Sequence, residues 1–223
     1  MLITAVTIGT SDLSALEDFH RDVLQLPVHR IDDTRIEVRV GTGTVRYERR
    51  ARSVGAHHLA FSVPPEDFER AREHISARVG ILPHDGSPVI AGPPGWDSRS
   101  VYFTAPDGLI LEYIAHEGHR GHSMSGPVPV PLGIAEVGIG VEDVPATVRE
   151  LTGRGLTPFP PQGPTFAPLG DIDGMLIVVD RHRLWFPELR DRPATDPSEI
   201  VLAQVGAPPG KICLQPAELF ITD

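Results

Sequence analysis

A pattern in which an alternating apolar strand runs directly into a helix start occurs three times in this 223-residue chain. The three copies are residues 5–13 (AVTIGTSDL), 58–66 (HLAFSVPPE) and 136–144 (EVGIGVEDV). Apolar side chains alternate with small or polar ones in each copy, which is typical of a strand with one buried face. Serine, aspartate or proline then marks the start of a helix. Such repetition indicates a fold built from similar units.

Further strand-like runs follow each predicted helix. They are residues 36–40 and 44–49 in the first copy, 100–104 and 109–115 in the second, and 175–179 with a further run at 183–186 in the third. The repeated unit is therefore a strand, a helix and two or three antiparallel strands. We predict an α+β protein made of tandem βαβββ modules.

Composition places the boundaries between the modules. We predict module 1 at residues 1–52, module 2 at 53–118, a degenerate βαββ module 3 at 132–205 and a C-terminal tail at 206–223. Residues 119–131 are rich in Gly, Pro, Ser and His, which is typical of a linker. We expect modules 1 and 2 to form the functional site together, with module 3 packing against them or mediating dimerisation.

The charge of the chain limits its partners. The formal net charge is −10 with a calculated pI near 5.4, which argues against binding to nucleic acid or to an anionic membrane surface. No apolar run approaches the roughly 20 residues of a membrane helix, and the N-terminus shows no signal-peptide pattern. We expect a cytoplasmic protein that binds a small molecule, with a homodimer left open.

Two polar side chains stand among apolar neighbours in the second copy. His58 lies on the small-residue face of its strand, and Glu112 shares a strand face with Ile110 and Ile114. A carboxylate between two isoleucines is costly to bury unless it is paired or bound to a cation. These two residues are therefore the first candidates for a metal site.

The same region resembles a known family. The strand 58–63 (HLAFSV) and the hairpin 102–112 (YFTAPDGLILE) resemble the vicinal oxygen chelate superfamily, which includes glyoxalase I, extradiol dioxygenases and bleomycin-resistance proteins. The hairpin is similar to a Phe-x-Asp-Pro-Asp-Gly-x-x-x-Glu pattern, with Ala105 where aspartate is usual. The resemblance implies a glyoxalase/bleomycin resistance/dioxygenase-like fold, in which curled mixed sheets form a cup around a divalent metal.

The resemblance also implies a ligand set. It assigns His58 and Glu112 in module 2 as metal ligands, with Glu48 from the last strand of module 1 as a third; Glu112 and Glu48 are also the candidate catalytic bases. Ala5 stands at the first-strand ligand position of module 1 and cannot bind metal. Glu136 occupies that position in the third copy, but a valine stands where its partner carboxylate is expected, which disfavours Glu136 as a ligand.

Other residues are candidates for contact with the substrate. Arg46 is able to clamp an anionic substrate. Aromatic side chains are able to line a pocket, although in strands they more often belong to the core. The candidates for substrate binding are Arg46, Tyr47, Trp96, Tyr102 and Tyr113. The predicted cofactor is Mn, Fe, Ni or Zn, or no metal at all.

These features favour a metal-dependent enzyme acting on a small, oxygen-chelating substrate. Isomerase, lyase or epimerase chemistry fits better than ring-cleaving dioxygenation, because non-haem Fe(II) oxygenases normally use two histidines and one carboxylate. One alternative is a metal-free protein that sequesters a small molecule in the cup, as bleomycin-resistance proteins do. Another is a non-catalytic dimerising scaffold, which predicts a cup filled by side chains.

Overall fold

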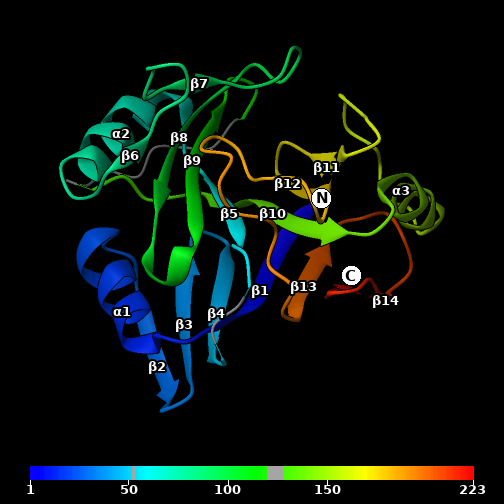
Figure 1. Ribbon diagram of the computed structural model, residues 1–223, viewed down its shortest axis with the longest axis horizontal. Coiled ribbons are helices and arrows are strands. Elements are labelled where there is room, and N and C mark those ends of the chain that lie inside the picture. The colour runs from blue at the N-terminus through cyan, green and yellow to red at the C-terminus, as the bar shows by residue number, and fades with distance from the viewer. Residues whose placement is uncertain (52–53, 120–127) are drawn as a thin grey trace.

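The computed structural model describes residues 1–51, 54–119 and 128–223, and it confirms the predicted α+β class. One curled, mixed β-sheet runs through the molecule, and the helices lie on its outside (Figure 1). The predicted module boundary at 52/53 and most of the predicted linker 119–131 lie outside the described residues. No helix in the described ranges is long and apolar enough to cross a membrane.

Unit 1 of the structure has the strand and helix order expected for the first copy. Its elements are β1 (Leu2–Thr10), α1 (Leu13–Asp18), the π-helical turn η1 (Phe19–Val23), β2 (Val28–Asp32), β3 (Arg35–Val40) and β4 (Gly43–Arg49). The Asp12 carboxylate begins α1 by accepting a hydrogen bond from the N–H of Ala15. Strands β1 and β4 pair in parallel, and β3 and β2 continue the sheet outward from β4.

Unit 2 repeats this arrangement. Its elements are β5 (His58–Ser62), the 3₁₀ turn η2 (Pro65–Asp67), α2 (Phe68–Ser76), β6 (Ile81–Leu82), β7 (Ile90–Ala91), β8 (Ser98–Thr104), the turn η3 (Pro106–Gly108) and β9 (Ile110–His116). The predicted hairpin is β8 and β9. Its turn holds Asp107 at φ 63° and Gly108 at φ 79°, so the glycine occupies a left-handed position that suits it. Strands β5 and β9 pair in parallel.

Unit 3 is shorter. Its elements are β10 (Gly133–Val141), α3 (Val144–Gly153), β11 (Phe166–Asp171) and β12 (Gly174–Asp180). The Asp143 side chain caps α3 through the N–H of Ala146. Strands β10 and β12 pair in parallel. The predicted strand at 183–186 is wrong, because these residues form irregular backbone after β12.

The last part of the chain forms a fourth strand unit. Unit 4 consists of β13 (Ser198–Ala203), β14 (Gly210–Cys213) and β15 (Ala217–Ile221), with β13 parallel to β15 and β14 antiparallel to it. This differs from the expected division into a module at 132–205 and a tail at 206–223. Strand β13 pairs with β1 and β15, whereas the strands of unit 3 pair among themselves and with β5 and β1.

The units join through their first strands. Strand β5 pairs antiparallel with β10, which joins units 2 and 3, and β1 pairs antiparallel with β13, which joins units 1 and 4. Between the two pairs, β1 meets β10 only at Ile3 and Ile134. The sequence led us to expect that modules 1 and 2 form one cup. In the structure, unit 2 instead pairs with unit 3, and unit 1 pairs with unit 4. Because β5 is bordered by β9 and β10, it has no free edge for β1.

The alternation read from the sequence determines the core. The odd-numbered side chains of β5, such as Leu59 and Phe61, are fully buried in the main core, on the face that α2 covers. The opposite face carries a second apolar cluster that includes Ala60, Ile114 and Trp185. The segment between β12 and β13, orange in Figure 1, lies against this second face.

Candidate metal centre

Three buried side chains with metal-binding atoms converge where units 2 and 3 meet. The Nε2 atom of His58 lies 3.5 Å from Oε2 of Glu112 and 3.5 Å from Oε2 of Glu136. One ligand atom from each residue lies within 4.8 Å of the other two, and no second group of this kind is found in the described ranges. Their side chains are exposed by only 6%, 1% and 6%, in that order. One imidazole and two carboxylates therefore face a common point.

Strand register explains why these side chains meet. Ala60 of β5 pairs with Glu112 of β9 on one side and with Glu136 of β10 on the other. Residues that pair directly across a sheet point to the same face, and so does the residue two positions earlier on the same strand. His58 therefore shares a face with both glutamates. Ala60 between them is small and leaves the space in front of the sheet open.

Burial makes the charged forms of the group unfavourable. It raises the pKa of Glu112 to about 8; the neighbouring Glu136 adds to this rise, and His58 opposes it. Burial also raises the pKa of Glu136 to about 8. The pKa of His58 is lowered by burial, against the attraction of Glu112. Without a cation, both carboxyls therefore hold protons near neutral pH and the imidazole is neutral.

The residues fit a divalent cation. Among the described residues, Oε2 of Glu112 and Oε1 of Glu136 have no hydrogen-bond donor, although both atoms are buried. A buried polar atom without a partner costs about 1–3 kcal/mol, and more when it is charged. A bound cation would give both oxygens a partner and would neutralise their charge. One neutral imidazole nitrogen with two carboxylate oxygens is a donor set that suits Mn²⁺, Fe²⁺, Ni²⁺ or Zn²⁺.

The His58 ring is held between two aromatic side chains. The ring of Tyr102 stacks on it with centroids 6.1 Å apart, and the Trp185 ring lies at 5.3 Å on a tilted plane. The indole N–H of Trp185 donates to the carbonyl oxygen of Ala56 at 2.9 Å, which fixes the indole. Gly138 on β10 makes room for it, since a Cβ there would lie 2.5 Å from Trp185. The orientation of His58 therefore depends on packing from β8, β10 and the segment after β12.

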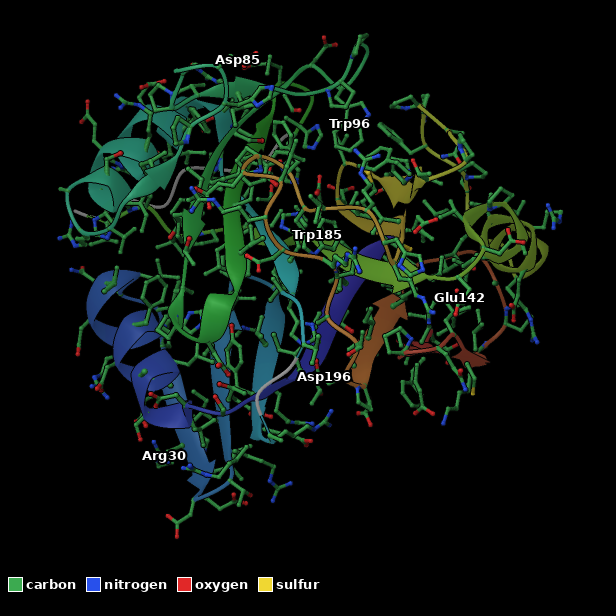
Figure 2. All side chains as sticks on the ribbon, viewed as in Figure 1. Arg30, Asp85, Trp96, Glu142, Trp185 and Asp196 are labelled. Atoms are coloured by element: carbon green, nitrogen blue, oxygen red, sulfur yellow. The ribbon has the colours of Figure 1, made fainter. Side chains whose placement is uncertain are left out.

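A cavity of about 480 Å³ opens from the group. Its aromatic lining consists of Trp96, Tyr102, Phe166, Trp185 and Phe186. Figure 2 shows Trp185 near the centre of the molecule and Trp96 closer to its upper edge. A largely apolar cavity of this size with a few polar groups at one end is typical of a small-molecule site. The alternative prediction of a cup filled by side chains is therefore wrong.

Glu48 is not part of this group. Its carboxylate lies on β4 of unit 1, is about one-third exposed and pairs with Arg50 at 2.7 Å. Arg46 lies on the same strand and pairs with Glu37. Neither residue lines the cavity. The structure separates both from His58 because unit 2 forms its seam with unit 3.

The aromatic candidates divide into two sets. Trp96 and Tyr102 line the cavity. Tyr47 is fully buried in unit 1, where its hydroxyl lies 2.8 Å from Nε2 of His20. Tyr113 is buried against Phe103, with ring centroids 5.2 Å apart. Both therefore belong to the core on the side of the sheet away from the cavity.

Glu136 is the residue that the sequence disfavoured and the structure brings to the site. A signal for it was present, because Glu136 occupies the same position in the third copy as His58 does in the second. The third copy holds no partner glutamate of its own, because Val178 stands at the matching position. The partner, Glu112, comes from the neighbouring unit across β5.

Comparisons with known proteins support the fold. No protein-family model and no curated protein sequence matches the chain. A solved structure from Bacillus subtilis, named "putative dioxygenase", aligns over 99% of this chain and 85% of its own, with a TM-score of 0.64 and 14% identity. Lactoylglutathione lyase from Agrobacterium tumefaciens aligns over a shorter stretch, which covers 51% of this chain and 92% of its own, with a TM-score of 0.42 and 20% identity. A glyoxalase/bleomycin resistance protein/dioxygenase from Alicyclobacillus acidocaldarius does so as well (TM-score 0.43, 15% identity, 52% and 91%).

The likeness over nearly the whole chain agrees with the strand topology, in which each unit closes its first strand on its last. The chain thus has the same curled, mixed-sheet fold as this solved structure, and this is the fold that the resemblance to the vicinal oxygen chelate superfamily implies. This confirms the resemblance that the strand at 58–63 and the hairpin at 102–112 indicated. At this level of identity the comparison establishes the fold, and the activity has to be argued from the site.

Proposed function

We propose that this protein is a metal-dependent enzyme in which His58, Glu112 and Glu136 hold a divalent cation. One observation carries the proposal: three potential ligand atoms lie within 4.8 Å of one another at the buried end of a cavity large enough for a small substrate. Two partnerless carboxylate oxygens in the same group support it. The cation identity is proposed only as one of Mn, Fe, Ni or Zn.

The chemistry follows from the donor set. A divalent cation in such a site stabilises negative charge that develops on the oxygens of a substrate. The set has one histidine and two glutamates, which departs from the two histidines and one carboxylate typical of non-haem Fe(II) oxygenases. We therefore favour an isomerase, lyase or epimerase over a ring-cleaving dioxygenase.

The chain itself supplies the groups for proton transfer. The carboxyls of Glu112 and Glu136 both face the cavity, where an ionised carboxylate suits exchange of a proton with a carbon next to a carbonyl group. Aromatic side chains line the cavity around them. Tyr102 lies on β8 beside Glu112, and its hydroxyl opposes the rise in the pKa of that carboxyl. We assign the proton-transfer role to Glu112 or Glu136.

Metal content is the measurement that tests the proposal. Protein purified without a metal-affinity tag is analysed by elemental analysis, beside His58→Ala, Glu112→Gln and Glu136→Gln. We expect near-stoichiometric metal in the wild type and a loss of roughly tenfold or more in affinity in each variant. Glu48→Gln is the matched control, because it makes the same chemical change in a carboxylate that pairs with Arg50 outside the group.

Two results would contradict the proposal. One is a metal-free wild type that also fails to take up added Mn²⁺, Fe²⁺, Ni²⁺ or Zn²⁺. The other is loss of metal in Glu48→Gln together with its retention in Glu136→Gln. A metal-free protein that still binds apolar small molecules would favour the sequestering function instead. A small-molecule partner, rather than nucleic acid or membrane, is part of the proposal; a homodimer and a cytoplasmic location stay predictions.

A further inference from the structure

The cavity has a charged side chain at its exposed edge. Arg183 lies in the turn after β12, is exposed, and lines the same cavity as Glu112 and Glu136. It is the sole lysine or arginine among the described residues that line this cavity. The cavity thus has a buried acidic end and one arginine near solvent.

Arg183 has no carboxylate partner among the described residues. Its Nη1 atom lies 3.5 Å from the hydroxyl of Thr165, and its guanidinium carbon lies 5.2 Å from the centre of the Phe166 ring. Phe166 lines the cavity as well. Stacking on an aromatic face restricts a guanidinium and leaves its N–H groups free for an anion. Arg181, two residues earlier, differs in that it pairs with Glu142 at 2.5 Å.

The rest of the lining is mostly apolar, with His84, Ser98 and Ser100 as its polar side chains. Its apolar part includes aromatic rings and the side chains of Ile90, Ile177 and Val179. A protein of net charge −10 repels anions in general, so a single free arginine at a cavity edge creates a local site that is selective for anions. The cavity thus has cation-binding groups, Glu112 and Glu136, at its buried end and an anion-binding group, Arg183, at its exposed edge, with a mostly apolar lining.

From this arrangement we propose the substrate class: a flat, mainly apolar molecule that carries chelating oxygens at one end and an anionic group, such as a carboxylate, at the other. Arg183 binds the anionic group and is the specificity-determining residue at the cavity edge. The inference rests on the proposed function, because the chelating end is directed to His58, Glu112 and Glu136.

The test uses two chelators that differ only at the distal end. Benzohydroxamate and 4-carboxybenzohydroxamate share the metal-binding group, and the second carries the added carboxylate. The chain has two tryptophans, Trp96 and Trp185, and both line the cavity, so quenching of intrinsic fluorescence reports binding. Dissociation constants are measured for the wild type, Arg183→Gln, Arg183→Lys and Arg181→Gln, each with its metal content determined.

We expect the wild type to bind the carboxylated probe about twofold to fivefold more tightly, as an exposed charge pair allows. This preference disappears in Arg183→Gln, is partly kept in Arg183→Lys and is unchanged in Arg181→Gln. It also shrinks as salt is raised. Equal dissociation constants for the two probes in the metal-loaded wild type, no binding of either probe up to millimolar concentration, or a preference that survives Arg183→Gln would overturn the inference.

The two proposals fail in different ways. A wild type that takes up no metal overturns the proposed function, whatever the two dissociation constants are. A wild type that holds metal and binds both probes equally overturns the role of Arg183 and leaves the metal centre in place. Because Arg183 is exposed, its variants are expected to fold, and the unchanged metal content verifies this in each sample.

Discussion

The Nε2 atom of His58 lies 3.5 Å from Oε2 of Glu136, although the two residues belong to different strand units. This contact exists because β5 and β10 pair antiparallel, in the register that sets Ala60 against Glu136. The second contact of His58, to Glu112, comes from the parallel pairing of β5 with β9 inside unit 2. The candidate site is therefore built at a seam between two units.

The buried carboxyls predict how the stability of the metal-free protein depends on pH. The pKa of Glu112 and of Glu136 is about 8 in the folded chain, against an ordinary value of 4.5. Between these values the folded protein holds protons that the unfolded chain has lost, so its free energy of unfolding falls as pH rises. The full stability is present below pH 4.5 and is lost as pH rises through about 8. Urea denaturation of metal-free protein from pH 5 to pH 9 measures this slope.

Neutral variants provide the control for this prediction. Glu136→Gln keeps the shape of the side chain and removes its titration, so we expect a flatter slope and, at pH 8–9, a metal-free protein more stable by about 1–3 kcal/mol. Glu48→Gln changes an ion-paired carboxylate in unit 1 and is expected to keep the wild-type slope. A slope that is identical in the wild type and in Glu136→Gln would contradict the buried, protonated state of this residue.

Metal binding is expected to release protons from the same two carboxyls. The carboxyls bind metal in their ionised form, while near neutral pH they are protonated in the metal-free protein. Calorimetric titration with Mn²⁺ in two non-coordinating buffers of different ionisation enthalpy measures the number of protons. We expect about one to two protons released at pH 6.5 and a number falling toward zero at pH 9. A number that does not vary with pH would show that neither carboxyl is a ligand.

Local sequence patterns predict the three strand–helix repeats that the structure contains, but not which units pair. The alternation in 58–63 places His58 and Ala60 on one face, and the hairpin at 102–112 places Glu112 beside them. Both depend on interactions within one unit, so the local sequence carries the signal. The partner of β5 across the seam depends on which strand edge is free after folding. The local pattern holds no information on this pairing. The sequence therefore predicts Glu48 as the third ligand, whereas the structure has Glu136 at that place.

The fourth unit was missed for a related reason. Residues 198–221 form three strands without a helix, and the repeat was recognised by a strand that runs into a helix start. Strand β13 finds its place through pairing with β1, which is remote in the sequence. Three consecutive apolar residues, Leu184, Trp185 and Phe186, predict a strand at 183–186, but the backbone there is irregular. Trp185 and Phe186 instead form part of the cavity wall.

A substitution at Gly138 tests how the His58 ring is held in position. A Cβ at this residue would lie 2.5 Å from Cη2 of Trp185 and 3.1 Å from Cβ of His58, so Gly138→Ala forces the indole to move. We expect metal affinity to fall by about tenfold, as for other changes that disturb the support of a ligand. The fluorescence of Trp185 should change as well. Metal titration followed by fluorescence measures both effects.

A second glycine provides the matched control. Gly153, at the end of α3, would place a new Cβ with no atom within 4 Å. Gly153→Ala is expected to leave metal affinity unchanged and to stabilise the protein slightly, because alanine is favoured over glycine in a helix by up to about 1 kcal/mol. Equal metal affinity in both variants would mean that the position of Trp185 does not affect His58.

A substitution at Tyr47 tests whether this residue belongs to the core of unit 1 or to the substrate site. Its hydroxyl lies 2.8 Å from Nε2 of His20, which is fully buried and has a pKa lowered by burial to about 3. Among the described residues Nδ1 of His20 has no partner, so Tyr47→Phe leaves the imidazole without any hydrogen bond. We expect a loss of about 1–3 kcal/mol in the free energy of unfolding, with metal content and hydroxamate binding unchanged.

The double variant His20→Leu/Tyr47→Phe should recover part of this loss, because it removes both polar groups together. Urea denaturation and metal analysis of the single and double variants measure these effects. If Tyr47→Phe instead bound hydroxamate more weakly and kept its stability, the result would support the substrate-binding role that the sequence predicted for Tyr47.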